Sequence, residues 1–126
     1  MSDPGDVPPS DGRPPATWFE HYLGAWNEHD AERVAGWFVD DGVLEDTTLG
    51  YRVEGRPAIA RFAVRSFQAV PEFRFEFVEG FDDGHHYAMR WLMQPGDVPG
   101  VSYGTLRGGR IEAHRDYWDG RRAQVP

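Results

Sequence analysis

The second half of the chain alternates between aromatic and mostly polar residues with the period of a β-strand. From Phe73 to Val78 every second residue is Phe, which predicts a strand with one buried face. Asp82-Asp83-Gly84 predicts a hairpin turn that leads into a long strand from His85 to Met93. Two further strands, Val101–Leu106 and Arg110–Trp118, flank a glycine pair. These segments predict a long antiparallel meander.

The first half carries helical spacing instead. Apolar side chains three and four residues apart form a stripe on a first helix that begins near Pro15-Ala16-Thr17: Phe19, Tyr22, Leu23 and Trp26. Asp30 is expected to cap a second helix that carries Val34, Trp37 and Phe38 and ends at Gly42.

Two short strands and a third helix complete the expected elements. The strands run through Val43–Asp46 and near Tyr51–Val53, and the helix opens at Gly55-Arg56-Pro57 and ends at Pro71. Helices followed by a meander predict an α+β domain. We expect a curved sheet folded over three helices from the N-terminal half, with an apolar pocket between the two layers.

Composition sets the domain boundaries. Residues 1–15 hold five of the 10 prolines, so we expect a disordered tail there. Residues 16–120 form the single predicted domain, and residues 121–126 a short C-terminal tail.

Charge and residue usage exclude several kinds of chemistry. A formal net charge of -8 argues against nucleic acid and anionic membrane surfaces as partners. The chain has no Cys and no Lys, so thiolate nucleophiles and lysine Schiff bases are excluded. No apolar run is long enough to span a membrane, and the N-terminus lacks a signal-peptide pattern, so we expect a cytoplasmic protein. We predict neither a metal nor a cofactor.

Several motifs together resemble the SnoaL-like branch of the nuclear transport factor 2-like superfamily. They are Tyr22–Asn27 with His29-Asp30, Phe38–Asp41 leading to Glu45-Asp46, Gly55–Ile59, Gly108–Ile111 and Arg115–Asp119. The resemblance covers roughly Trp18 to Asp119. It implies a cone-shaped fold that enzymes such as ketosteroid isomerase, limonene epoxide hydrolase and polyketide cyclases share.

The resemblance also implies site residues. Compared with ketosteroid isomerase, Tyr22 and Asp46 match the oxyanion-hole tyrosine and the general base, while Ser102 falls near the position of a protonated acid. Compared with limonene epoxide hydrolase, Arg90 and Asp116 match two members of an Asp–Arg–Asp triad. Leu92 stands where that triad has its other acid. Polyketide cyclases use an acid in the penultimate strand, where this chain has Ser102 and Tyr103.

Strand alternation groups the remaining candidates by face. One face of the long strand carries Arg90 and Leu92, and the last strand carries His114, Asp116 and Trp118 together. If both sets face the pocket, Arg90 and Asp116 pair at its floor. The other face of the long strand is apolar, and we expect it to form a homodimer surface: Tyr87, Met89, Trp91 and Met93.

Structural alternatives remain open for each candidate. Asp46 could cap the turn at Thr47-Thr48, and Tyr22 could be ordinary core. Arg90 and Asp116 could form a structural ion pair, and His114 could be a satisfied, half-buried histidine. The predicted catalytic residues are Asp46, Tyr22, Asp116 and Arg90. The predicted substrate-binding residues are Trp26, Phe62, Leu92, Ser102, Tyr103, His114 and Trp118.

Three functions fit this pattern. The first is a cofactor-independent enzyme in which Asp46 moves a proton on an apolar, polyketide- or terpenoid-like substrate, in an isomerisation or aldol-type cyclisation. The second is epoxide opening by water that Asp116 activates and Arg90 orients. The third is a non-catalytic ligand-binding or accessory dimer, whose sign would be a cavity too small for a ligand or filled by side chains.

Overall fold

The computed structural model describes residues 18–122. The predicted tail at residues 1–15 and the end of the C-terminal one, 123–126, lie outside the described residues. The elements follow in the order α1 (Trp18–Asn27), α2 (Ala31–Gly36), β1 (Phe38–Asp46), β2 (Tyr51–Glu54), α3 (Arg56–Ala69), β3 (Arg74–Asp82), β4 (His86–Gln94), β5 (Val98–Arg107) and β6 (Arg110–Trp118). The predicted α+β class with its three N-terminal-half helices is confirmed.

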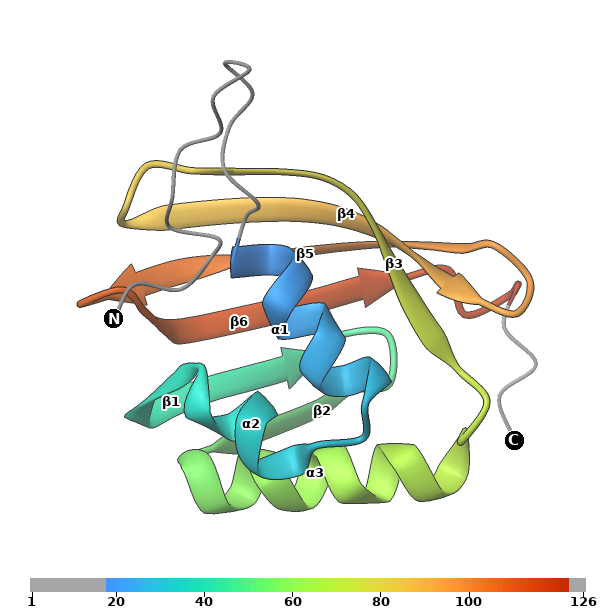
Figure 1. The fold of residues 1–126 in the computed structure, drawn as a ribbon, viewed down its shortest axis with the longest axis horizontal. Helices are drawn as coiled ribbons and strands as arrows, with labels where there is room; N and C mark the ends of the chain where they lie inside the picture. The colour runs from blue at the N-terminus through green and yellow to red at the C-terminus, as the bar shows by residue number, and fades with distance from the viewer. Residues whose placement is uncertain (1–17, 123–126) are drawn as a thin grey trace.

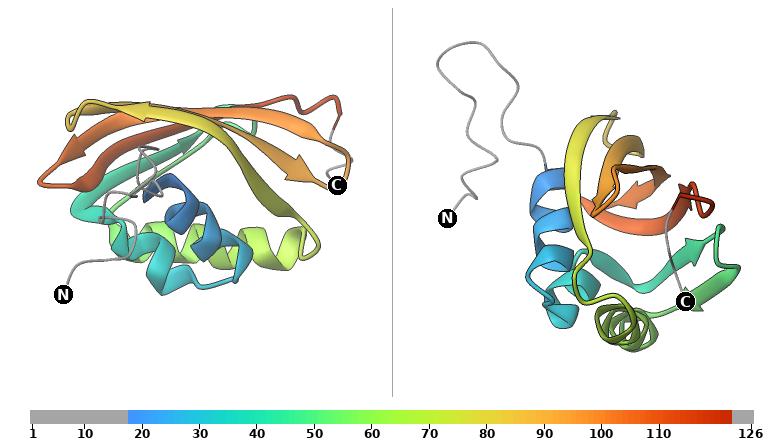
Figure 2. Two further views of the ribbon diagram at one scale, coloured as in Figure 1. Left: turned by 45° about the horizontal axis from the view of Figure 1, so that its top comes forward. Right: turned by 90° about the vertical axis from the view of Figure 1, so that its right-hand side faces the viewer.

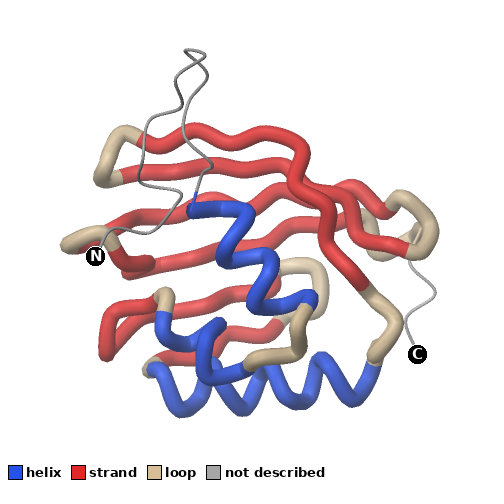
Figure 3. The backbone as a smooth tube through the Cα atoms, in the orientation of Figure 1, coloured by secondary structure: helices blue, strands red, loops and turns tan. Residues whose placement is uncertain are grey.

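All six strands form one curved sheet in the order β2-β1-β6-β5-β4-β3 (Figures 1 and 3). Strands β3 to β6 make the predicted antiparallel meander. Strand β1 then pairs with β6 in parallel, which sets Asp46 beside Asp116 across some seventy residues of sequence. Register shifts in β1 and β3 mark irregularities where such a sheet bends.

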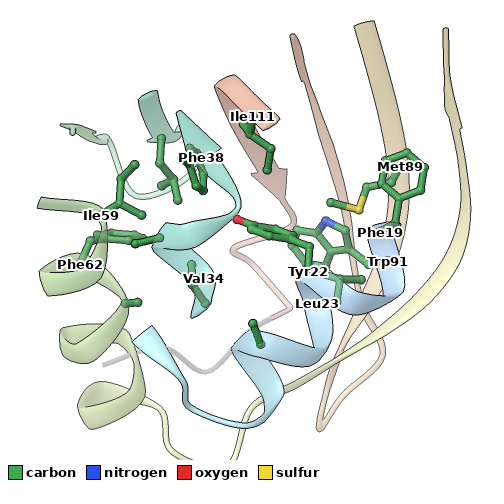
Figure 4. Close-up of a cluster of buried hydrophobic side chains, with 14 of the residues drawn as sticks. Phe19, Tyr22, Leu23, Val34, Phe38, Ile59, Phe62, Met89, Trp91 and Ile111 are labelled. Carbon is green, nitrogen blue, oxygen red and sulfur yellow. The ribbon is translucent and has the colours of Figure 1, made fainter. Parts of the chain in front are cut away.

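The three helices lie on the concave side of the sheet (Figure 2). Helix α1 packs against β3, and α3 packs against α2 and β1. The side chains between the layers are apolar and almost fully buried, including Phe19, Val34, Phe38, Ile59 and Ile111 (Figure 4). Burying each such side chain stabilises the fold by roughly 1.5–3 kcal/mol.

The second helix is shorter than its sequence pattern predicts. Asp30 caps it as expected, accepting a hydrogen bond from the Arg33 N–H at 3.1 Å, but the helix ends at Gly36. Phe38 begins β1 and pairs with Ile111 of β6, so its placement in a helix was wrong. Pairing with a central strand of the sheet outweighs the helical spacing of one aromatic residue.

The assignment of β4 faces was also wrong. Alternation groups the residues correctly, but the apolar row is the buried one: Tyr87, Met89, Trp91 and Met93 are 2–5% exposed. Arg90 and Leu92 therefore lie on the outer face of the sheet, where Arg90 contacts Glu79 at 2.9 Å. A homodimer through the outer face stays a prediction, but these four residues cannot form it.

Strand β5 carries small residues toward the helices. Gly100, Ser102 and Gly104 share the inner face, and a Cβ at Gly100 would lie 2.2–2.6 Å from the Trp91 ring. A Cβ at Gly104 would lie 1.9 Å from the Ala113 carbonyl oxygen and 2.8 Å from the Tyr87 hydroxyl. The two glycines therefore leave the room that the large β4 side chains need beside Ser102.

Candidate active site

A cavity of about 430 Å³ lies between the sheet and the helices. This volume is within the range of small-molecule sites, and the walls are mainly aromatic and aliphatic. The polar side chains on its walls include Tyr22, Asp46, Ser102, His114 and Asp116. The C-terminal parts of β1 and β6 meet here because the two strands are parallel and pair Asp46 with Asp116.

Asp46 is 7% exposed and ends β1. Its Oδ1 accepts the Leu49 N–H at 2.9 Å, and the Trp118 indole N–H lies 3.2 Å from Oδ1 and 3.1 Å from Oδ2. Burial raises the pKa of Asp46, the Leu49 and Trp118 donors partly offset this, and the charge of Asp116 raises it further. A carboxyl group with a raised pKa is a better proton acceptor than an exposed one.

Asp116 is the end point of a chain of hydrogen bonds. The Trp91 indole N–H donates to Ser102 Oγ at 2.8 Å, and the Ser102 hydroxyl donates to Asp116 Oδ1. His114 Nε2 lies 2.8 Å from the same oxygen. Oδ2 of Asp116 takes part in none of the hydrogen bonds among residues 18–122 and remains free to accept one.

The same chain assigns the tautomer of His114. Nε2 faces a carboxylate oxygen and must carry the hydrogen, which leaves Nδ1 to accept from the Tyr87 hydroxyl. Burial raises the pKa of Tyr87, so its phenol is protonated and can donate. The donors of Trp91 and Tyr87 are thus linked to Asp116 through Ser102 and His114.

The Tyr22 hydroxyl on the cavity wall is buried and has no hydrogen-bond partner within residues 18–122. The Tyr22 ring extends from α1 toward the centre of the molecule (Figure 4), and the residue is 1% exposed. Burial and then the charge of Asp116 raise its pKa, an effect that the nearby Trp26 indole only partly offsets. The phenol is therefore a protonated donor in search of an acceptor.

The structure brings eight of the eleven predicted site residues to the cavity wall: Tyr22, Trp26, Asp46, Phe62, Ser102, His114, Asp116 and Trp118. Three were wrong. Arg90 and Leu92 point outward from β4, and Tyr103 lies on the outer face of β5, where it stacks on Tyr117. The expected pairing of Arg90 with Asp116 at the cavity floor does not occur.

Sequence reasoning missed other residues around the cavity. Trp91 and Met93 line it and Tyr87 anchors His114. The uniformly apolar row on β4 could have identified Trp91, Met93 and Tyr87 as inward-facing, because a strand with one polar and one apolar row buries the apolar row. His29 and Arg65 are exposed residues at its rim, and no sequence pattern singled them out. No group of three or more metal-ligating side chains occurs in residues 18–122.

A curved mixed sheet closed by three helices over an acid-bearing apolar cavity defines a class of cone-shaped pocket domains. The family model of the SnoaL-like domain matches residues 19–114, and the chain belongs to this family. No curated protein matches the chain. No helix among the described residues is long and apolar enough to cross a membrane.

Solved structures share the fold. A hypothetical protein with a ketosteroid isomerase-like fold from Catenulispora acidiphila, in complex with trimethylamine, has a TM-score of 0.78 at 18% identity, covering 86% of this chain and 92% of that one. A candidate isomerase of the SnoaL-like family from Agrobacterium tumefaciens has a TM-score of 0.69 at 26% identity, covering 81% and 94%. A candidate polyketide cyclase from Sinorhizobium meliloti has a TM-score of 0.68 at 27% identity, covering 79% and 92%.

Proposed function

We propose that this protein is a cofactor-independent enzyme that moves a proton on an apolar carbonyl compound. Asp46 removes a proton from the carbon next to the carbonyl group, and Tyr22 donates a hydrogen bond to the oxygen on which negative charge develops. Isomerisation and aldol-type cyclisation of a polyketide- or terpenoid-like substrate both begin with this step.

One observation carries the proposal: a carboxyl group with a raised pKa and a buried phenol without a partner line the same apolar cavity. The first is suited to accept a proton near neutral pH, and the second to stabilise an enolate oxygen. The candidate isomerase and candidate polyketide cyclase among the structural neighbours support this type of reaction.

Deuterium exchange tests the proposed step without knowledge of the natural substrate. The protein is incubated in D₂O with a panel of apolar ketones, beginning with 2-tetralone, and deuterium at the α-carbon is measured by NMR. We expect exchange above the buffer rate, and a loss of at least ~100-fold in Asp46→Asn, the usual contribution of a general base.

A neighbouring carboxylate supplies the matched control. Glu45 precedes Asp46 on β1 but forms an ion pair with Arg115 at 3.3 Å and does not line the cavity. Glu45→Gln should exchange like the wild type. Equal rates in Asp46→Asn and the wild type, or no exchange with any ketone, would overturn the proposal and favour a binding protein.

The two alternative functions, epoxide opening and non-catalytic binding, are less well supported. Epoxide opening required Arg90 beside Asp116, and Arg90 lies on the opposite face of the sheet. The non-catalytic function predicted a cavity that is small or filled, whereas the cavity holds about 430 Å³. Proton transfer is therefore the function that the site supports best.

A further inference from the structure

In residues 18–122, the acids that pair with arginine all lie at or near the surface. Eight acids with exposed or half-exposed side chains form ion pairs with arginine: Glu28, Asp40, Asp41, Glu45, Glu54, Glu79, Glu112 and Asp119. Asp46 and Asp116, the two acids of the cavity, have no arginine partner among the described residues. Asp116 has only His114, whose Nε2 lies 2.8 Å from Oδ1.

Apart from His114, no basic side chain of residues 18–122 contacts these acids inside the cavity. Arg65 and His29 line it, but both are exposed at the rim, and His29 stacks on Phe67 with ring centroids 4.5 Å apart. A buried negative charge without a cation is unfavourable. Within residues 18–122 the two cavity acids therefore have no arginine as a counter-charge.

A second observation points to a ligand in the same place. The Tyr22 hydroxyl is buried in the cavity wall without a partner, and the Tyr22 ring lies 5.3 Å from the ring of His114, which contacts Asp116. Asp116 Oδ2 is also free to accept. A phenol and a carboxylate oxygen left open together are the groups that a polar ligand would satisfy.

The remaining wall suits a cation as well as an apolar group. Trp26 makes edge-to-face contacts with Phe62, Phe67 and Phe75, at centroid distances of 6.3, 5.7 and 6.2 Å. Trp91 packs edge-on against Phe75 at 5.1 Å. Aromatic rings attract organic cations through their faces and also bind hydrocarbon groups.

We infer that the ligand of this cavity is an apolar molecule bearing a protonated amine, and that Asp116 binds the ammonium group through Oδ2. The inference rests on the proposed function, in which this cavity is the substrate site. It assigns separate tasks to the two acids: Asp116 anchors the nitrogen, and Asp46 remains available to take the proton. Asp116 is held for this task by Ser102 and His114, which occupy its other oxygen.

A pair of nearly isosteric probes tests the inference: 2-phenylethylamine, protonated at pH 7.5, and 2-phenylethanol. Their binding to the full chain is measured by calorimetry, and the quenching of tryptophan fluorescence provides a second readout. We expect the amine to bind at least ~10-fold more tightly than the alcohol. Measurements on the wild type alone can overturn the inference. They do so if the two affinities are equal, if the alcohol binds more tightly, or if the amine does not bind.

Two variants locate the preference. Asp116→Asn keeps the size and can still accept from Ser102, and it should reduce the amine-to-alcohol ratio to about one. Glu79→Gln removes one negative charge from the outer face and controls for attraction by the net charge; it should keep the wild-type ratio. A ratio that survives in Asp116→Asn would show that Asp116 is not the anchor.

The test of the amine anchor can be distinguished from the test of proton transfer. If the amine preference is found but no ketone exchanges deuterium, the ligand class stands and the proposed reaction fails. If exchange occurs in the wild type and is lost in Asp46→Asn while both probes bind equally, the reaction stands and the amine anchor fails.

Discussion

The indole N–H of Trp118 lies between the two carboxylate oxygens of Asp46, 3.2 Å from Oδ1 and 3.1 Å from Oδ2. Asp46 ends β1 and pairs with Asp116 of β6. Trp118 ends β6, two residues after Asp116. The contact stabilises the ionised form of Asp46 and counteracts part of the rise in pKa that burial causes.

Trp118→Phe removes this donor and keeps an aromatic ring. The pKa of Asp46 should rise further, so the acid limb of the exchange rate should move to higher pH. The pH dependence of deuterium exchange measures the shift. Trp37→Phe, in which the altered ring packs against Trp18, should leave the profile unchanged, and an unmoved profile in Trp118→Phe would contradict the assignment of Asp46 as base.

Asp46→Asn should also change how stability depends on pH. The folded pKa of Asp46 is raised above its unfolded value of about 3.9, so the folded chain holds this proton to higher pH. The wild type therefore loses stability as pH rises from the unfolded pKa through the folded pKa, and the loss is constant above it. The free energy of unfolding of the variant, minus that of the wild type, should grow across this window.

Urea denaturation between about pH 3 and pH 8 measures this difference. Asp41→Asn provides a control of opposite sign. Arg107 lowers the pKa of Asp41, so the stability from that pair is fully present above the unfolded pKa and is lost as pH falls through the folded pKa. A difference for Asp46→Asn that stays flat or declines with rising pH would contradict a raised pKa.

The two buried tyrosines should respond in opposite ways to loss of the hydroxyl. Tyr22→Phe removes a group without a partner, so the free energy of unfolding should stay the same or rise by up to ~1–3 kcal/mol. Exchange should fall by about 100- to 1000-fold, as for loss of an oxyanion donor. Tyr87→Phe leaves His114 Nδ1 without its donor and should destabilise the fold by ~1–3 kcal/mol.

Urea denaturation and the exchange assay on both variants separate these roles. A Tyr22→Phe protein that unfolds much more readily than the wild type would indicate that Tyr22 is ordinary core. A Tyr87→Phe protein as stable as the wild type would contradict the hydrogen-bond chain that ends at Asp116.

Gly104→Ala should destabilise the fold by at least ~1–3 kcal/mol, because the new methyl group meets the Ala113 carbonyl at 1.9 Å and the Tyr87 hydroxyl at 2.8 Å. Gly24→Ala is the matched control. Nothing lies within 4 Å of a Cβ there, and alanine in a helix should stabilise by roughly 0.5–1 kcal/mol. Thermal unfolding compares the two, and equal effects would contradict the close packing at β5.

Local pattern accounts for much of the fold. Helical spacing from Phe19 to Trp26 predicted α1, and Asp30 was correctly expected to cap α2. The helical spacing up to Phe38 wrongly predicted a helix there, because Phe38 pairs with Ile111 of β6 in the sheet. The spacing of neighbouring residues cannot predict a strand partner more than seventy positions away.

Alternation along a strand specifies which side chains share a face, since it follows from backbone geometry. Arg90 was grouped correctly with Leu92, and His114 with Asp116. Which face of β4 lies inside could not be read from this pattern, because it depends on where the helices cover the sheet. The same long-range pairing of β1 with β6 brings Asp46 and Asp116 into one cavity, and no local interaction along the chain could specify that meeting.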